Sequence, residues 1–153
     1  MTAVLGVLET ALYVSELNRA KKFYVDVVGL TPMFEDERLV ALDAGGRSTL
    51  LLFLRGESIH DRQIRGGLLP GHNGWGPLHM AFAISSESLS GWKEKLADAK
   101  VGLRGEMEWP AGGRSIYFND PDGHLLELAT PGIWPNFPAF GDVQGQGAPP
   151  EFR

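Results

Sequence analysis

Two carboxylates and one imidazole are the residues of this chain best placed to do chemistry. Glu9 and His79 each open a segment of alternating hydrophobicity, and Glu127 interrupts the apolar run 125–129. A carboxylate among apolar neighbours is costly unless it is paired or binds a cation, and no Lys or Arg has an obvious place beside Glu127. A divalent metal ion bound by Glu9, His79 and Glu127 would neutralise both carboxylates and leave positions for water or substrate, as a catalytic metal centre requires.

The predicted strands and helices that carry these residues follow the same order in the two halves of the chain. In the first half a strand is expected at 9–14, then a helix from Glu16 that Gly29 ends, then strands at 38–42 and 48–54. In the second half the pattern predicts a strand at 79–84, a helix that ends near Gly102, and a hairpin of strands 114–119 and 124–129. Glu9 and His79 occupy equivalent places in the two copies, because each begins the first strand.

The repeat predicts an α+β fold in a single domain, 1–153, built from two tandem βαβββ modules whose curled mixed sheets form a cup. Module one covers about 5–56, a glycine-rich connection about 57–77, module two about 78–130, and an irregular tail 131–153. The connection is expected to be long and mobile. The aromatic residues of the proline-rich tail would close a pocket or dock on a second subunit; they are Trp134, Phe137 and Phe140.

Composition narrows the possible partners. The chain has 153 residues, 43% hydrophobic and 22% charged, with a net charge of −5, so it is globular and lacks the basic face that nucleic acid needs. Its apolar runs are far shorter than the roughly 20 residues of a membrane span, and the N-terminus lacks the basic residues of a signal peptide. We therefore expect a cytoplasmic protein. Without cysteine, a metal must be held by His, carboxylates or water.

Several of these segments resemble a known family. The segments are Leu12–Leu17, Lys22–Tyr24, Gly29–Leu30, Leu78–Phe82 and Tyr117–Leu128. Together they resemble the vicinal oxygen chelate superfamily, which includes glyoxalase I, bleomycin-resistance and fosfomycin-resistance proteins, methylmalonyl-CoA epimerase and extradiol ring-cleaving dioxygenases. The Asp-Pro-Asp-Gly turn followed by Glu127 is the most specific part. The resemblance implies two βαβββ modules around a metal, in agreement with the repeat.

The resemblance implies Glu9, His79 and Glu127 as metal ligands, with two departures. Glu9 replaces the usual His or Gln, so the His-His-Glu set of ring-cleaving dioxygenases is not reproduced. The fourth ligand of glyoxalase-like members falls in the stretch 50–53, which holds only Leu and Phe. Such an oxygen-rich site favours Mn²⁺, Fe²⁺, Mg²⁺, Ni²⁺ or Co²⁺, and Zn²⁺ stays possible.

Further residues are candidates for roles around the metal. In the family a ligating Glu can dissociate and act as a base, which makes Glu9 and Glu127 catalytic candidates, and His72 in the glycine-rich connection could swing over the metal as an acid or base. Tyr13, Arg114, Tyr117 and Trp134 are the candidates for substrate binding. His60 and His124 are expected at the surface.

Three functions follow from these expectations. The first is a metal-dependent lyase or isomerase acting on a small-molecule substrate with vicinal oxygens, in a homodimer. The second is ring cleavage or another Fe²⁺ dioxygenase reaction. The third is a non-catalytic protein of the bleomycin-resistance type that sequesters a cationic aromatic drug in an acidic groove lined by Trp.

Overall fold

The computed structural model describes residues 2–138, which fall into two compact units divided between Gly76 and Pro77. The first unit contains a four-stranded sheet in the order β1-β4-β3-β2. Its strands are β1 (Glu9–Val14), β2 (Thr31–Glu35), β3 (Leu39–Asp43) and β4 (Thr49–Leu54). Helix α1 (Leu17–Phe23) runs on into the π-helical turn η1 (Tyr24–Val28). That helical segment ends at Gly29, whose φ of 91° is the left-handed conformation expected of it.

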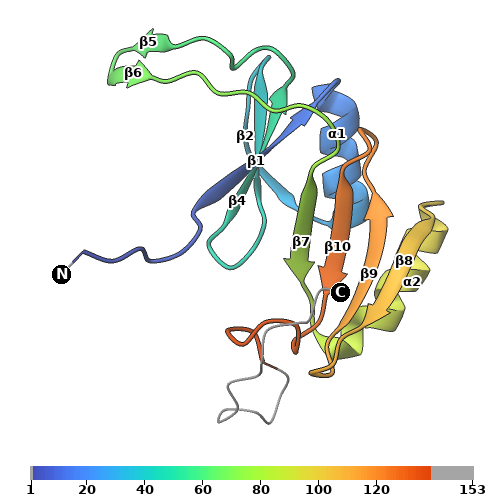
Figure 1. Ribbon diagram of the computed structural model, residues 1–153. Helices are drawn as coiled ribbons and strands as arrows, with labels where there is room; N and C mark the ends of the chain where they lie inside the picture. Colours follow the sequence, from blue (N-terminus) through green and yellow to red (C-terminus); the bar gives the residue numbers. More distant parts are fainter. Residues whose placement is uncertain (1, 139–153) are drawn as a thin grey trace. The chain divides into compact units, whose positions relative to one another are not determined.

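The second unit contains a sheet in the order β7-β10-β9-β8 (Figure 1). Its strands are β7 (His79–Ala83), β8 (Leu103–Glu108), β9 (Arg114–Asn119) and β10 (Leu125–Ala129). The 3-10 turn η2 (Ser86–Ser88) leads into helix α2 (Leu89–Asp98). This helix stops before Gly102, since Lys100 adopts the left-handed conformation and the N–H of Val101 bonds to the carbonyl of Leu96 at 2.8 Å.

The two sheets repeat one register, which confirms the duplicated βαβββ pattern. In the first, β1 pairs with β4 in parallel, so Glu9 lies beside Thr49 and Ala11 beside Leu51. In the second, β7 pairs with β10 in parallel, so His79 lies beside Leu125 and Ala81 beside Glu127. Neither sheet closes on itself, because each ends in two different edge strands.

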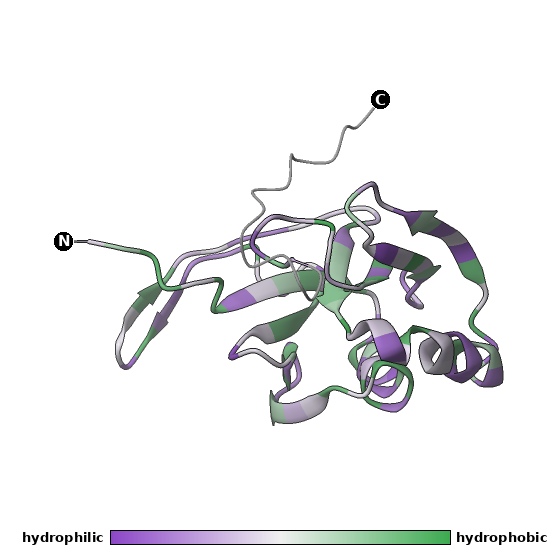
Figure 2. Cartoon of the chain, turned by 90° about the horizontal axis from the view of Figure 1, so that it is seen from below, coloured by the Kyte–Doolittle hydropathy of each residue, from purple (hydrophilic) through white to green (hydrophobic). Residues whose placement is uncertain are grey.

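One face of each sheet is buried beneath its helix. Leu12 and Val14 of β1 share the buried face of the first sheet with Leu50 and Leu52 of β4. In the second sheet, Ile116 and Phe118 are buried and alternate along β9 with Ser115 and Tyr117. Residues that alternate with the buried ones lie on the opposite face. The helices are banded with hydrophilic and hydrophobic residues, as elements covering a sheet should be (Figure 2).

Strands β2 and β8 complete the predicted βαβββ modules, although no residue range could be assigned to them from the sequence. Both are edge strands whose residues are almost all exposed, so their sequences lack the alternation that marks a half-buried strand. The connection is also more ordered than expected, because it contains the hairpin of β5 (Arg62–Ile64) and β6 (Gly67–Leu69). Among the residues described, no helix is long and apolar enough to cross a membrane.

Candidate functional site

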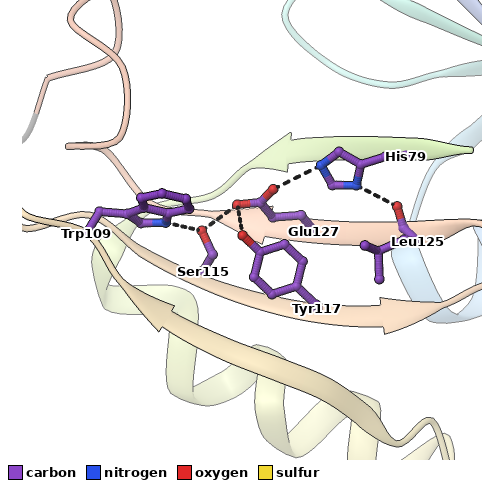
Figure 3. A network of polar contacts seen from close by, with 6 residues as sticks. All are labelled: His79, Trp109, Ser115, Tyr117, Leu125 and Glu127. Atoms are coloured by element: carbon purple, nitrogen blue, oxygen red, sulfur yellow. Dashed lines mark hydrogen bonds and ion pairs between the residues drawn. The ribbon is translucent and has the colours of Figure 1, made fainter. Parts of the chain in front are cut away.

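The side chains of His79 and Glu127 lie close together on the face of the second sheet opposite helix α2. His79 begins β7 and Glu127 lies in the middle of β10, on the neighbouring strand. Nε2 of His79 is 3.3 Å from Oε2 of Glu127 (Figure 3). The imidazole is half exposed, whereas 9% of the carboxylate side chain is accessible. The structure thus brings two of the three predicted metal ligands together within this unit.

The hydrogen bond of the other ring nitrogen of His79 shows whether Nε2 carries a proton, and therefore what can bind between Nε2 and Oε2 of Glu127. Nδ1 lies 2.9 Å from the carbonyl oxygen of Leu125, and a carbonyl can only accept, so Nδ1 carries the proton. In the neutral ring Nε2 is then an unprotonated acceptor that faces a carboxylate oxygen. Two acceptors at this distance need a proton or a cation between them. A ligating histidine held by a backbone carbonyl is the usual arrangement at metal sites.

Two side chains donate to the other oxygen of Glu127, and a third supports one of them (Figure 3). The buried Ser115 hydroxyl donates to Oε1 at 2.5 Å, and the Tyr117 hydroxyl donates to the same oxygen at 3.1 Å. Nε1 of Trp109 in turn donates to the Ser115 oxygen at 2.8 Å. Burial, and next the charge of Glu127, raise the pKa of Tyr117 and keep this donor protonated. Oε2 is thereby left to face His79.

The spacing of the pair suits a common metal ion. Protein nitrogen and oxygen ligands bind divalent metals at about 2.0–2.2 Å. Two such ligands are about 3.0 Å apart at a right angle and about 3.4 Å apart at the tetrahedral angle. The observed 3.3 Å between Nε2 and Oε2 lies within that interval. The donor types and their separation therefore fit a divalent ion.

Glu9 belongs to the first unit. It is exposed at the start of β1, on the same face as Ala11 and Tyr13. In the repeated register, Glu9 corresponds to His79 and Leu51 corresponds to Glu127. The apolar Leu51 therefore stands in the first module at the register position that Glu127 occupies in the second. No group of three or more His, Asp or Glu side chains suited to a metal is found among residues 2–138, so Glu9 as a third ligand stays a prediction.

His72 is fixed against the first sheet. Its Nδ1 lies 2.7 Å from the hydroxyl of Tyr13, and its ring packs edge-on against Phe53 at 4.6 Å between centroids. The backbone of His72 is bonded to Ser58 at both its N–H and its carbonyl. These contacts fix the position of His72 in its loop, and its predicted role as an acid or base over the metal stays a prediction.

The other predicted substrate-binding residues differ in their placement. Tyr117 lies beside Glu127, as described above. Arg114 begins β9, its Nε is 3.8 Å from Oε1 of Glu108, and it alternates with Ser115, so its side chain leaves from the other face. Trp134 is 49% exposed in the tail of the second unit. Their roles in binding stay predictions, and Phe140 lies outside the described residues.

The expectation that His124 lies at the surface is wrong. His124 is fully buried, and its Nδ1 accepts the N–H of Leu78 at 2.9 Å. This bond anchors the residue before His79 to the turn before β10. Sequence reasoning also missed Ser115, although this residue alternates in phase with Tyr117 and could have been placed on the Glu127 face.

Comparisons with known proteins agree with this architecture. The sequence model of the Glyoxalase/Bleomycin resistance protein/Dioxygenase superfamily matches residues 6–128. The metallothiol transferase FosB of Bacillus licheniformis is 31% identical over 132 residues, which cover 86% of this chain and 79% of that protein.

Solved structures show the same similarity. The lactoylglutathione lyase of Agrobacterium tumefaciens superposes with a TM-score of 0.79 at 30% identity, covering 87% of this chain and 98% of that one. The fosfomycin resistance protein FosX of Listeria monocytogenes superposes with a TM-score of 0.58 at 24% identity, covering 85% of this chain and 94% of that one. This second similarity concerns the fold alone.

Proposed function

Since the chain belongs to the glyoxalase/bleomycin resistance protein/dioxygenase superfamily, we propose that it is a divalent-metal enzyme acting on a small molecule with two neighbouring oxygen atoms. The observation that carries the proposal is the approach of Nε2 of His79 to Oε2 of Glu127, with the opposite atom of each side chain already hydrogen-bonded. A lyase or isomerase reaction is the first candidate, supported by the similarity to lactoylglutathione lyase.

His79 and Glu127 would hold the ion, and Glu9 is proposed as a third ligand because it is the register equivalent of His79. When bound, a divalent ion supplies a Lewis acid for the substrate's oxygens. The exposed residues Ala81 and Ala83 alternate with the half-buried side of β7 and extend the face that His79 begins. Their small side chains leave space for a substrate there.

The two glutamates are suited to different tasks. Oε1 of Glu127 receives two hydrogen bonds, so this side chain is held as a ligand. Glu9 is exposed and its carboxylate has no hydrogen bond to the part of the chain between residues 2 and 138. We therefore assign the movable base to Glu9, which would take a proton from the carbon beside a substrate carbonyl. Glu9→Gln should keep the metal and lose turnover.

Metal analysis tests the proposal directly. Protein purified without a histidine tag is dialysed against Mn²⁺, Fe²⁺, Co²⁺, Ni²⁺, Zn²⁺ or Mg²⁺, and the bound metal is measured by elemental analysis. One ion per chain is expected for the wild type, with loss of that ion in His79→Gln and Glu127→Gln. Glu94→Gln, on the exposed side of α2, is the matched control. Metal content that is unaffected by the first two substitutions would contradict the site.

A second candidate reaction is thiol transfer. It is favoured by the 31% identity to a metallothiol transferase over most of both chains. Turnover of the metal-loaded protein that depends on an added thiol would select it over isomerisation. Oxygen uptake by the Fe²⁺-loaded protein would select the dioxygenase reaction. Tight binding of a cationic drug by a protein that takes up no metal would select sequestration.

We also propose a homodimer as the working form. The supporting consideration is the expectation from sequence that tail aromatics such as Trp134 dock on a second subunit, together with the 49% exposure of that side chain. Sedimentation velocity of the wild type and of Trp134→Ala measures the association. A monomer at all concentrations would contradict it.

A further inference from the structure

A second polar site lies on the first sheet, on the face that carries Glu9. Tyr13 of β1 and Phe53 of β4 are register partners, and His72 packs against both rings. Tyr13 and Phe53 are buried, whereas His72 is exposed. The two buried rings therefore support the imidazole of His72 from below, and one edge of the imidazole faces the solvent.

The loop that carries His72 is built to hold it in place. Gly71 packs so closely on the carbonyl oxygen of Ile59 that a Cβ atom would lie 2.5 Å from it, and its N–H donates to Oδ1 of Asp61 at 2.7 Å. A Cβ on Gly74 would lie 2.1 Å from a ring carbon of Tyr13. Glycine is thus required on both sides of His72, and such close backbone packing restricts the loop.

The contact with Tyr13 determines which ring nitrogen of His72 is free. Its length of 2.7 Å is compatible with a Tyr13 hydroxyl that donates to Nδ1. Burial also raises the pKa of Tyr13, which keeps its proton on the phenol. With Nδ1 accepting from Tyr13, the neutral ring carries its proton on Nε2. Nε2 has no hydrogen-bond partner in the described part of the chain.

We propose that His72, oriented by Tyr13, is a binding residue that donates its Nε2–H to an oxyanion group of the substrate. One cation and one carboxylate lie nearby: the Arg55 N–H bonds to the Val14 carbonyl and its guanidinium packs over Trp75, and Asp61 accepts from the Gly71 N–H. We expect the arginine to assist the His72 donor in attracting an anion. Carboxylates and phosphates share the acceptor oxygens that such donors bind.

The position of this site suggests the length of the substrate, and this step rests on the proposed function. Tyr13 follows Glu9 by four residues of a strand, a rise of roughly 13 Å. A donor at that distance from a metal ligand is suited to the far end of the substrate and not to the reacting atoms. The substrate class would be a molecule with chelating oxygens at one end and an oxyanion at the other.

Nuclear magnetic resonance of ¹⁵N-histidine-labelled protein tests the proposal without a known substrate. Long-range ¹H–¹⁵N spectra report the tautomer of each of the four histidines, and single His→Gln variants assign them. We expect the Nε2–H tautomer for His72, and a mixture of tautomers in Tyr13→Phe. Sodium phosphate and sodium acetate should each shift the Nε2 resonance saturably, against sodium chloride at equal ionic strength, and the better binder identifies the oxyanion.

The variants separate this inference from the metal site. Tyr13→Phe should weaken phosphate or acetate binding about 2- to 10-fold, the equivalent of one hydrogen bond. His60→Gln, an exposed histidine of the same loop, should leave it unchanged. Zn²⁺ should shift His79 and leave His72 in place. An unshifted His79 refutes the metal proposal alone, whereas an Nδ1–H tautomer of His72, its titration by Zn²⁺, or its indifference to both anions overturns the inference.

Discussion

Removing the Ser115 hydroxyl should destabilise the metal-free protein by an amount set by the charge of Glu127. The hydroxyl is buried and donates to the carboxylate at 2.5 Å. Hydrogen bonds to charged groups contribute about 1.5–3 kcal/mol, so Ser115→Ala should lower the free energy of unfolding by about 2 kcal/mol. For a chain of this size that corresponds to a fall in Tm of about 6 °C.

Urea unfolding followed by circular dichroism in the presence of a chelator measures this loss. A double-mutant cycle with Glu127→Gln isolates the carboxylate's share, because the bond from Trp109 to Ser115 is lost in both backgrounds. The cost of Ser115→Ala should fall to about 1 kcal/mol beside the neutral amide. Ser88→Ala removes an exposed hydroxyl bonded to a carbonyl and should cost less than about 0.5 kcal/mol.

The same substitution should weaken metal binding. Side chains that orient a ligand typically account for 10- to 100-fold in metal affinity, and Ser115→Ala should fall in that range by isothermal titration. Equal cost of Ser115→Ala in both backgrounds, with unchanged metal affinity, would refute the view that Ser115 holds Glu127 in place.

Three further substitutions test the surroundings of the two sites. Gly74→Ala places a methyl group against the Tyr13 ring and should cost about 1–3 kcal/mol in urea unfolding, whereas Gly66→Ala, in open space, should cost little. The raised pKa of Tyr13 should keep stability constant up to about pH 10 and lower it as pH rises through the folded-state pKa, more steeply than in Tyr13→Phe. His124→Leu removes the acceptor of the Leu78 N–H and should cost about 1–3 kcal/mol, with weaker metal binding.

Each of these expectations has a result that contradicts it. Equal stabilities of Gly74→Ala and Gly66→Ala would mean that the loop is free to move away from β1. Parallel alkaline profiles of the wild type and Tyr13→Phe would mean that this phenol ionises normally in the folded chain. A His124→Leu variant as stable as the wild type would mean that Leu78 finds another acceptor.

The edge strands show why part of the fold escapes sequence reasoning. Strand β10 is apolar around Glu127 and β7 alternates, so both could be predicted from burial. Strands β2 and β8 are held by backbone hydrogen bonds to a single neighbour and bury almost nothing. Their sequences therefore carry no periodicity that distinguishes them from loops.

The histidines likewise include one whose place could be predicted from the sequence and others whose place could not. His79 could be matched to Glu9 by the repeat, because the first strand of each module begins at the same place in the pattern. His124 and His72 could not be placed, since one is buried by a turn and the other is fixed by a loop that returns to Tyr13 across 59 positions. Such contacts depend on how distant segments meet.

The order of the residues was enough to predict two repeated βαβββ modules, and to predict that Glu127 needs a partner on a face without Lys or Arg. The periodicity of burial and the cost of an unpaired charge depend on residues that are neighbours in the chain, so both can be predicted from the sequence. Three contacts could be known only from the folded chain: Nε2 of His79 faces Oε2 of Glu127, Ser115 donates to the opposite oxygen, and Tyr13 contacts Nδ1 of His72. Hydrogen bonds between strands depend on register and side-chain direction, which arise when the sheets assemble.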